Sequence, residues 1–371
     1  MSFQMNAGAV RRFAKAMKFG AWLQAIPNKL TPPAFRLMQI GSAFWQSRAL
    51  YVVARLDIAT MLGDEELDAG VIATRVASNT DAIGRLLRLL AAIGVFEEKA
   101  PHVFRNNKIS AFLRTDNPKN VRAMILMHNS DAMSRPWYEH LEQGIREGVP
   151  PFRLTHGEDL FDYLDHHADL DSLFSEAMDS VEALTGDSFA IDFDWGRFER
   201  IIDVGGSRGA KSLAILKRHP KLIALVVDRP QVIAEAKHYW STHNASDTER
   251  LSFQSGDAFT TIPSAQGEKD IYLLSAVLHG FDDGTCTTVL RNVANACGQT
   301  GARIALLEMV LPEVGADVAG ASFDMQMFMG SRGRERTLRE WTAVFDDSGL
   351  VLEEVVGLQS FGNILVLHPK K

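Results

Sequence analysis

Residues 201–209 read Ile-Ile-Asp-Val-Gly-Gly-Ser-Arg-Gly, an apolar strand that runs into an acid and a glycine-rich turn. A helical pattern over 211–218 and a second apolar strand over 222–227 follow it. Strand and helix alternate in this way as far as the strand 303–310, which predicts a mostly parallel sheet covered by helices on both faces. Ligands bind beyond the carboxyl ends of such strands, so a site is expected at this first turn.

The glycine turn does not match G-x-G-x-x-G, the fingerprint of nicotinamide-dependent oxidoreductases. Ser207 and Ala210 occupy the second and third glycine positions, and the spacing fits D-x-G-x-G-x-G with Ser207 in place of the middle glycine. Gly205 and Gly206 let a backbone approach a ligand closely. Asp203 would repel a pyrophosphate but hold an ammonium group, which favours S-adenosylmethionine over a dinucleotide.

Two further acids end the next two strands. Asp228 can accept hydrogen bonds from both ribose hydroxyls, and Asp257 offers a carboxylate to an adenine amine beside the apolar Ala258 and Phe259. Each acid alone is equally compatible with a helix cap or a loop. Three acids at three successive strand ends predict a cofactor site, to which we add Ser275 at the end of the fourth strand.

The N-terminal third has another pattern, short helices followed by a hairpin, which is typical of a winged helix. The last of these helices begins at a cap on Thr80 or Asp81. A winged helix can bind DNA through residues such as Arg85 and Arg88, but no basic stripe accompanies them, which favours a packing or dimerisation module over a transcription factor. The predicted helices are 43–62, 69–77 and 81–93, and the predicted hairpin pairs 95–99 with 102–106.

The chain is therefore expected to have three parts. Residues 1–115 form an N-terminal winged-helix dimerisation domain, 116–189 a helical bridge that lines an acceptor pocket, and 190–371 an S-adenosylmethionine-binding catalytic domain. The catalytic domain closes with two antiparallel strands, because the apolar runs 350–356 and 363–367 have no helix between them. A small winged-helix unit cannot cover its flanking apolar helices alone, so we expect a homodimer.

Composition excludes several classes of protein. The 371 residues carry 39 basic and 46 acidic side chains, a net charge of −7 that disfavours nucleic acid and membrane surfaces as partners. No stretch approaches the ~18 apolar residues of a membrane-spanning helix. Two cysteines provide no disulfide framework, which suits the cytoplasm, and the acids and histidines of 162–169 lack the spacing of a metal motif, so we expect no metal.

From about Phe44 onward the sequence resembles the S-adenosylmethionine-dependent small-molecule O-methyltransferases of secondary metabolism, of the caffeate, acetylserotonin and antibiotic-tailoring type. Their Rossmann-like sheet and winged-helix dimerisation region match the α/β fold predicted above. The motifs that carry the resemblance are 202–209, 227–230, 256–259, 278–283, 307–313 and 334–337.

The resemblance implies methyl transfer to a hydroxyl of a small phenolic or heteroaromatic acceptor. It implies His279 as general base, with Glu308 and Glu335 flanking and orienting it, and cofactor contacts from Gly205, Asp228, Asp257 and Phe259. An imidazole with a pKa near 6.5 can accept a phenol proton as the oxygen attacks. On the residues alone, His279 could equally cap the helix that follows it.

The acceptor pocket is less well defined by the sequence. The resemblance places Asp324, Met325 and Phe328 beside it, and Met127 could close it from the bridge, although these apolar residues could equally be core. The family usually has Asp-Trp where this chain has Gly280-Phe281, and Lys-Trp where it has Ser275-Ala276. Some relatives with this fold bind the cofactor but catalyse hydroxylation, decarboxylation or rearrangement, so a non-methylating reaction on a similar aromatic or polyketide substrate is the alternative.

Overall fold

The computed structural model describes residues 2–243 and 246–370. Contacts within the chain divide it into two compact units, one formed by Met1–Trp22 with Asp187–Lys371 and the other by Leu23–Gly186. The first 22 residues thus accompany the sheet-containing unit, whereas the sequence grouped them with the winged-helix region. We call the two parts the catalytic unit and the helical unit. The expected limits at 115 and 189 stay a prediction.

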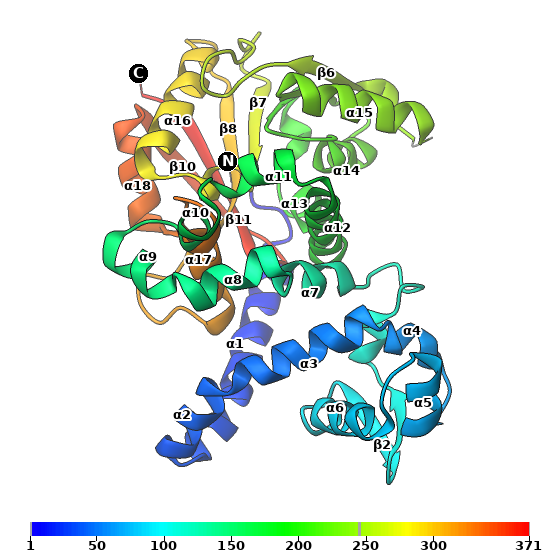
Figure 1. Ribbon diagram of the computed structural model, residues 1–371. Helices are drawn as coiled ribbons and strands as arrows, with labels where there is room; N and C mark the ends of the chain where they lie inside the picture. Colours follow the sequence, from blue (N-terminus) through cyan, green and yellow to red (C-terminus); the bar gives the residue numbers. More distant parts are fainter. Residues whose placement is uncertain (1, 244–245, 371) are drawn as a thin grey trace. The chain divides into compact units, whose positions relative to one another are not determined.

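A twisted sheet forms the centre of the catalytic unit (Figure 1). Its strands lie in the order β6-β5-β4-β7-β8-β11-β10, parallel from β6 to β8 and antiparallel for β11 and β10. The mostly parallel sheet and its antiparallel end are therefore confirmed. The last strand lies inside the sheet, between β8 and β10, and β10 forms the edge. The bounds are β4 Arg200–Val204, β5 Ile223–Asp228, β6 Leu251–Ser255, β7 Asp270–Ser275, β8 Arg303–Leu311, β10 Leu350–Gly357 and β11 Gly362–Pro369.

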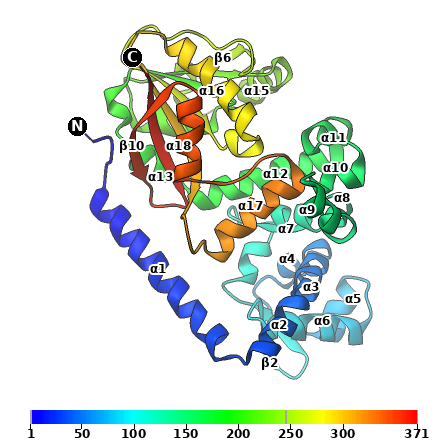
Figure 2. The same ribbon diagram turned by 90° about the vertical axis from the view of Figure 1, so that its left-hand side faces the viewer.

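Both faces of this sheet are buried because successive strand residues point to opposite sides. On β7, Ile271 and Leu273 join one apolar cluster, whereas Tyr272 and Leu274 join the other. Helices α13 (Ser188–Ile191), α14 (Ala210–Arg218) and α15 (Pro230–Thr242) supply residues to the first cluster, and α16 (Asp283–Cys297) and α18 (Leu338–Asp347) to the second. Figure 2 shows α18 beside β10 on this second side.

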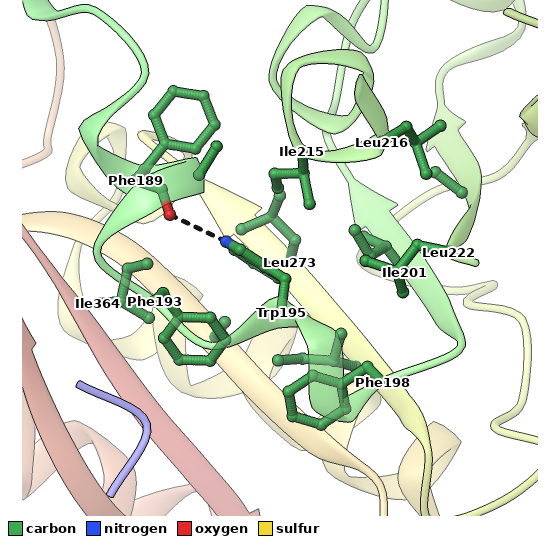
Figure 3. Packing of buried hydrophobic residues seen from close by; sticks show 14 of the residues in the cluster. Phe189, Phe193, Trp195, Phe198, Ile201, Ile215, Leu216, Leu222, Leu273 and Ile364 are labelled. Carbon is green, nitrogen blue, oxygen red and sulfur yellow. Dashed lines mark hydrogen bonds between the residues drawn. The ribbon is translucent and has the colours of Figure 1, made fainter. Parts of the chain in front are cut away.

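The first cluster is centred on Trp195, which is fully buried and whose indole Nε1 donates a hydrogen bond to the Phe189 carbonyl at 2.9 Å (Figure 3). The N-terminal residue Phe3 is 5% exposed and stacks on Phe193, with 5.5 Å between the ring centroids. The Phe3 amide also donates to Glu354 on β10. Residue 3 is therefore part of the catalytic core, which explains why the first segment groups with this unit.

The helical unit contains the predicted winged helix. A three-stranded sheet pairs β3 (Val103–Asn106) with both β2 (Phe96–Ala100) and a short β1 (Leu67–Asp68) that the sequence did not predict. The three expected helices correspond to the four helices α3 to α6. The expected helix 43–62 is broken at Asp57, whose φ of 51° separates α3 from α4. The bounds are α3 Ala43–Arg55, α4 Ile58–Leu62, α5 Ala69–Arg75 and α6 Thr80–Ala92.

The predicted cap of the last winged-helix helix was wrong by one or two residues. The side chain of Asn79 accepts a hydrogen bond from the Ala82 amide, so Asn79 and not Thr80 or Asp81 is the N-cap of α6. Asp81 instead pairs with Arg85 on the helix surface. Asn has the extended backbone and the short acceptor that an N-cap needs, and Asn-Thr-Asp offers three candidates that spacing alone does not separate.

Two helices begin the chain and bury none of their described side chains. They are α1 (Ala7–Leu30) and α2 (Pro33–Gly41). The other α-helices of the helical unit are α7 Arg122–His128, α8 Asp131–Glu139, α9 Leu141–Glu147, α10 Pro151–His156, α11 Leu160–His166 and α12 Ala168–Thr185. The catalytic unit also contains α17 Val318–Gly330 and β9 Arg336–Thr337.

Candidate active site

The glycine turn after β4 takes backbone conformations that side chains disfavour. Gly205 and Gly209 have φ values of 74° and 73°, and Ser207, in the place of the middle glycine, has a φ of 50°. Ser207 therefore carries the left-handed conformation at a cost that glycine would avoid. Asp203 is 2% exposed, and its carboxylate accepts a hydrogen bond of 2.7 Å from Ser212 on α14. Its contact with a cofactor stays a prediction.

Asp228 joins the ends of the first two strands. Its carboxylate accepts hydrogen bonds from the amides of Ser207, at 2.9 Å, and Arg229, at 2.8 Å. The Asp228 carbonyl accepts from Gly256, where an added Cβ would lie 2.5 Å from a Val227 methyl group. The acid that the sequence assigned to ribose is thus held at the carboxyl edge, next to the glycine turn.

The loop after β6 brings the third acid to the same edge. Asp257 accepts a hydrogen bond from the Phe259 amide at 2.9 Å. Asn292 on α16 donates to the carbonyls of Ala258 and Phe259, at 3.0 and 2.7 Å, and so fixes the loop from the helix behind it. The sequence gave no signal for Asn292, since an amide in the middle of a helix has no motif of its own.

Strands β5 and β6 lie on one side of β4, and β7 and β8 lie on the other. The strand order therefore reverses between β4 and β7, which is the switch point at which open α/β sheets bind ligands. Ser275 ends β7 there, and its hydroxyl is buried without a hydrogen-bond partner among the described residues. A buried hydroxyl without a partner is costly unless a ligand or water satisfies it. This orphan hydroxyl and the acids at the neighbouring strand ends fit a cationic cofactor rather than a phosphate-bearing one.

His279 lies in a 3-10 turn, Leu278–Gly280, directly beyond β7. Its Nδ1 forms a hydrogen bond of 2.9 Å with Glu335 Oε1 and lies 3.9 Å from Glu308 Oε2. Both carboxylates are 3% exposed. The helix that follows is capped by Asp282, whose side chain accepts from the Thr285 amide, so the alternative that His279 caps this helix was wrong.

The electrostatics of the turn favour the protonated imidazole. Burial alone lowers the pKa of His279, but the carboxylates of Glu308 and Glu335 more than reverse this, and the net pKa is raised. Burial raises the pKa of Glu308, whose Oε2 has no hydrogen-bond partner among the described residues. His279 can act as a base only in its neutral form, and a raised pKa moves the formation of that form to higher pH.

Residues near 335 complete the surroundings of His279. Asp324 on α17 accepts a hydrogen bond of 2.9 Å from the Glu335 amide, which is a positioning contact that the sequence did not predict. A Cβ added at Gly333 would lie 2.0 Å from the His279 carbonyl, so only glycine fits there. Neither Gly333 nor the buried Arg336 was assigned a role from sequence, because their partners are more than 50 residues away.

The predicted acceptor residues are divided between the two units. Met325 and Phe328 lie half-buried on α17 of the catalytic unit with Asp324. Met127 lies on α7 of the helical unit and is 2% exposed. Their roles toward an acceptor stay predictions. Within the described residues, no helix has the length and apolarity to cross a membrane, and no group of three or more metal-binding side chains could hold an ion.

Known proteins resemble this chain along most of its length. A phenazine O-methyltransferase of Lysobacter antibioticus is 29% identical over 90% of this chain and 95% of its own. An 8-amino-8-demethylriboflavin N,N-dimethyltransferase of Streptomyces davaonensis is 29% identical over 89% and 93%. An O-methyltransferase from neocarzinostatin biosynthesis, solved with S-adenosylmethionine and 2-hydroxy-5-methyl naphthoic acid, has a TM-score of 0.73 and 26% identity over 87% and 96%.

Family models match both parts of the chain. The O-methyltransferase dimerisation domain matches residues 38–116, the region of the winged helix, and the O-methyltransferase domain matches residues 138–351, which include the glycine turn, the strand-end acids and His279. The resemblance inferred from the motifs is thereby confirmed, as is the cofactor of the family, S-adenosylmethionine. With a matching sheet, a matching dimerisation domain and a family model over more than half of its length, this chain belongs to the S-adenosylmethionine-dependent O-methyltransferases.

Proposed function

We propose that this protein transfers a methyl group from S-adenosylmethionine to a hydroxyl of a small aromatic acceptor, with His279 as the general base. The observation that carries the proposal is the 2.9 Å hydrogen bond between His279 Nδ1 and the buried Glu335. A carboxylate on Nδ1 selects the tautomer with the proton on that nitrogen, which leaves the lone pair on Nε2. Glu335 thus orients the imidazole and stabilises the charge it gains on taking a proton.

The cofactor supplies an electrophilic methyl group on a sulfonium whose charge is lost during transfer. We propose that the chain holds it with the acids Asp203, Asp228 and Asp257, which together favour a cation and exclude a phosphate. The glycine turn then keeps the backbone close to the ligand, and Phe259 provides an apolar wall. The full proposed set is Asp203, Gly205, Gly206, Asp228, Asp257, Ala258, Phe259 and Ser275.

An aromatic acceptor is supported by what the relatives are named for, a phenazine and a naphthoic acid among them. We propose that Met325, Phe328 and Met127 contact the ring and that Asp324 acts through Glu335. One relative is named for dimethylation of an amino group, which makes an aromatic amine the second candidate acceptor. The dimerisation domain supports a homodimer formed through residues 1–115.

The test is a transfer assay with a ¹³C-methyl-labelled cofactor and matched acceptors. The protein is incubated with phenols, with the corresponding anilines and with the corresponding methyl ethers. The masses of the products are measured by mass spectrometry. We expect label on phenols and none on the ethers, which have no proton for His279 to remove. Label on anilines alone would replace oxygen by nitrogen as the acceptor atom. Cofactor binding in a calorimeter without label on any acceptor would favour the non-methylating alternative.

A further inference from the structure

Two buried charged side chains hold the turn that carries His279, one through its amides and the other through its carbonyls. Glu308 on β8 accepts hydrogen bonds from the amides of Val277 and Leu278, at 3.2 and 3.0 Å. On the other side, Arg336 on β9 donates to the carbonyls of Leu278 and Phe281, at 3.4 and 2.8 Å. One carbonyl precedes His279 in the chain and the other follows it, so Arg336 holds the backbone on both sides of the imidazole.

Arg336 is itself fixed in place. It is 0% exposed, its Nε donates to Asp283 at 2.8 Å, and its guanidinium lies 4.8 Å from the centre of the Trp341 ring. A buried guanidinium is stable only when its planar set of donors finds partners, and stacking on an aromatic face adds to that. A fork of fixed geometry binds two carbonyls at a defined separation, which a lysine ammonium cannot do.

Arg336 also follows Glu335 directly in the chain, so both partners of the His279–Glu335 hydrogen bond depend on its position. The preceding loop packs against the turn at Gly333, where a side chain would overlap the His279 carbonyl. Any movement of the turn relative to β9 would change the distance between imidazole and carboxylate. We propose that Arg336 is a positioning residue for methyl transfer, which fixes the His279 turn against Glu335. This inference rests on the proposed role of His279 as base.

Charge gives Arg336 a second, separable effect. The charged groups that face His279 are Glu308 on β8, Glu335 before β9 and Arg336 on β9. Burial lowers the pKa of His279, the two carboxylates raise it by more, and the guanidinium lowers it. Arg336→Lys keeps the charge and loses the fork, whereas Arg336→Met loses both. The two variants therefore separate geometry from electrostatics.

The experiment compares Arg336→Lys and Arg336→Met with Arg334→Lys and Arg334→Met as matched controls. Arg334 is exposed and pairs with Glu340 in the first turn of α18. For each variant we would measure kcat, acceptor KM, cofactor affinity, thermal unfolding, and the pKa of His279 by NMR of labelled histidine.

We expect Arg336→Lys to lower kcat by about ten to a hundredfold through misplacement of the base, with cofactor affinity and KM unchanged. Arg336→Met should do the same and also raise the pKa of His279, which moves the pH profile to higher pH. Both Arg334 variants should behave as wild type.

Wild-type kcat and wild-type His279 signals in a folded Arg336→Lys protein would overturn the proposal. Failure of both Arg336 variants to fold would overturn it as well, since Arg336 would then serve the whole unit and not the base. Failure of the proposed function can be distinguished from failure of this inference. Turnover of His279→Ala tests whether His279 is the base, whereas the NMR signals of His279 in the Arg336 variants report the position of the imidazole without turnover.

Discussion

The two units differ in the charged side chains that they bury. Among the described residues, the catalytic unit buries six charged side chains, and the buried polar residues of the helical unit are uncharged. The α2 helix of the helical unit instead exposes its large apolar side chains. Buried charge fixes geometry at a reaction site, whereas exposed apolar surface is stable only when something covers it. The buried charges are Asp192, Asp203, Asp270, Glu308, Glu335 and Arg336, and the exposed apolar residues of α2 are Phe35, Leu37, Met38 and Ile40.

The buried charges of the catalytic unit include the two carboxylates around His279, and we expect His279→Ala to have the largest effect of all the variants. Removing a positioned base should lower kcat by about a hundred to ten-thousandfold, with cofactor affinity near wild type. High pH should restore part of the turnover, because a phenol ionises without help near its pKa of about 10. Rates across pH on a labelled phenol check this, with His238→Ala on the exposed face of α15 as control. Full turnover by His279→Ala at neutral pH would leave proximity as the source of catalysis.

The role of the exposed apolar residues of α2 can be tested by adding charge to that helix. Phe35→Glu with Met38→Glu puts two carboxylates on one face of the helix, and apolar anchors at the centre of an interface contribute about 2 kcal/mol or more each. We expect the wild-type dimer to become a monomer in light scattering. The matched control is Val314→Glu with Val318→Glu, which are 89% and 84% exposed in the catalytic unit. A dimer in both double variants would place the interface elsewhere.

Asp228→Ala tests whether the strand-end acids hold the cofactor. Loss of charge-assisted hydrogen bonds should weaken cofactor binding by about ten to a hundredfold in calorimetry. Asp228→Asn, which keeps one oxygen for the Ser207 amide, should lose less. Glu235→Ala, an exposed acid on the neighbouring helix, serves as control. Equal affinity in wild type and Asp228→Ala would remove Asp228 from the site.

The smallest effects are expected from Glu335→Gln and Glu308→Gln, which compare the two carboxylates near His279. Turnover should rise with pH as His279 loses its proton, and this rise is the ascending limb of the pH profile. Both carboxylates raise the pKa of His279, so removing either one should move the ascending limb to lower pH. We expect Glu335→Gln to show that displacement with a loss of about tenfold in kcat. Glu308→Gln keeps an oxygen for the Val277 and Leu278 amides and should shift the limb with a smaller loss. A limb that moves to higher pH in either variant would contradict this account.

Local pattern was enough to predict most of the sheet. Strands buried on both faces are continuous apolar runs, and the helices between them start and end at recognisable signals, so the expected strand 201–204 lies within one residue of β4. The place of β11 between β8 and β10 was not predictable, since it depends on pairing between Ile364 and Leu307, far apart in the chain. The break at Asp57 and the cap at Asn79 were missed because neighbouring residues offered equally good signals.

The site was predictable where acids and glycines follow strands, and less so where contacts are long-range. The strand-end position of Asp228 follows from the alternation of elements alone. In contrast, Arg336 reaches Phe281 across 55 residues, and nothing in the local sequence distinguishes it from the exposed Arg334. Burial of a charge is decided by the packing of several elements, which no single stretch of sequence contains.

The hydrogen bond from the Phe3 amide to Glu354 has a consequence for biosynthesis. The two residues are 351 positions apart, and Gln4 likewise receives a hydrogen bond from the Gly357 amide. At synthesis rates of about 5 to 20 residues per second, roughly 18 to 70 s separate the appearance of the two partners. During that interval the Phe3 amide lacks the Glu354 carboxylate to which it donates in the folded chain. Completion of the catalytic core is therefore a late event, because it joins Phe3 and Gln4 to a strand that has not yet been synthesised when these residues emerge from the ribosome.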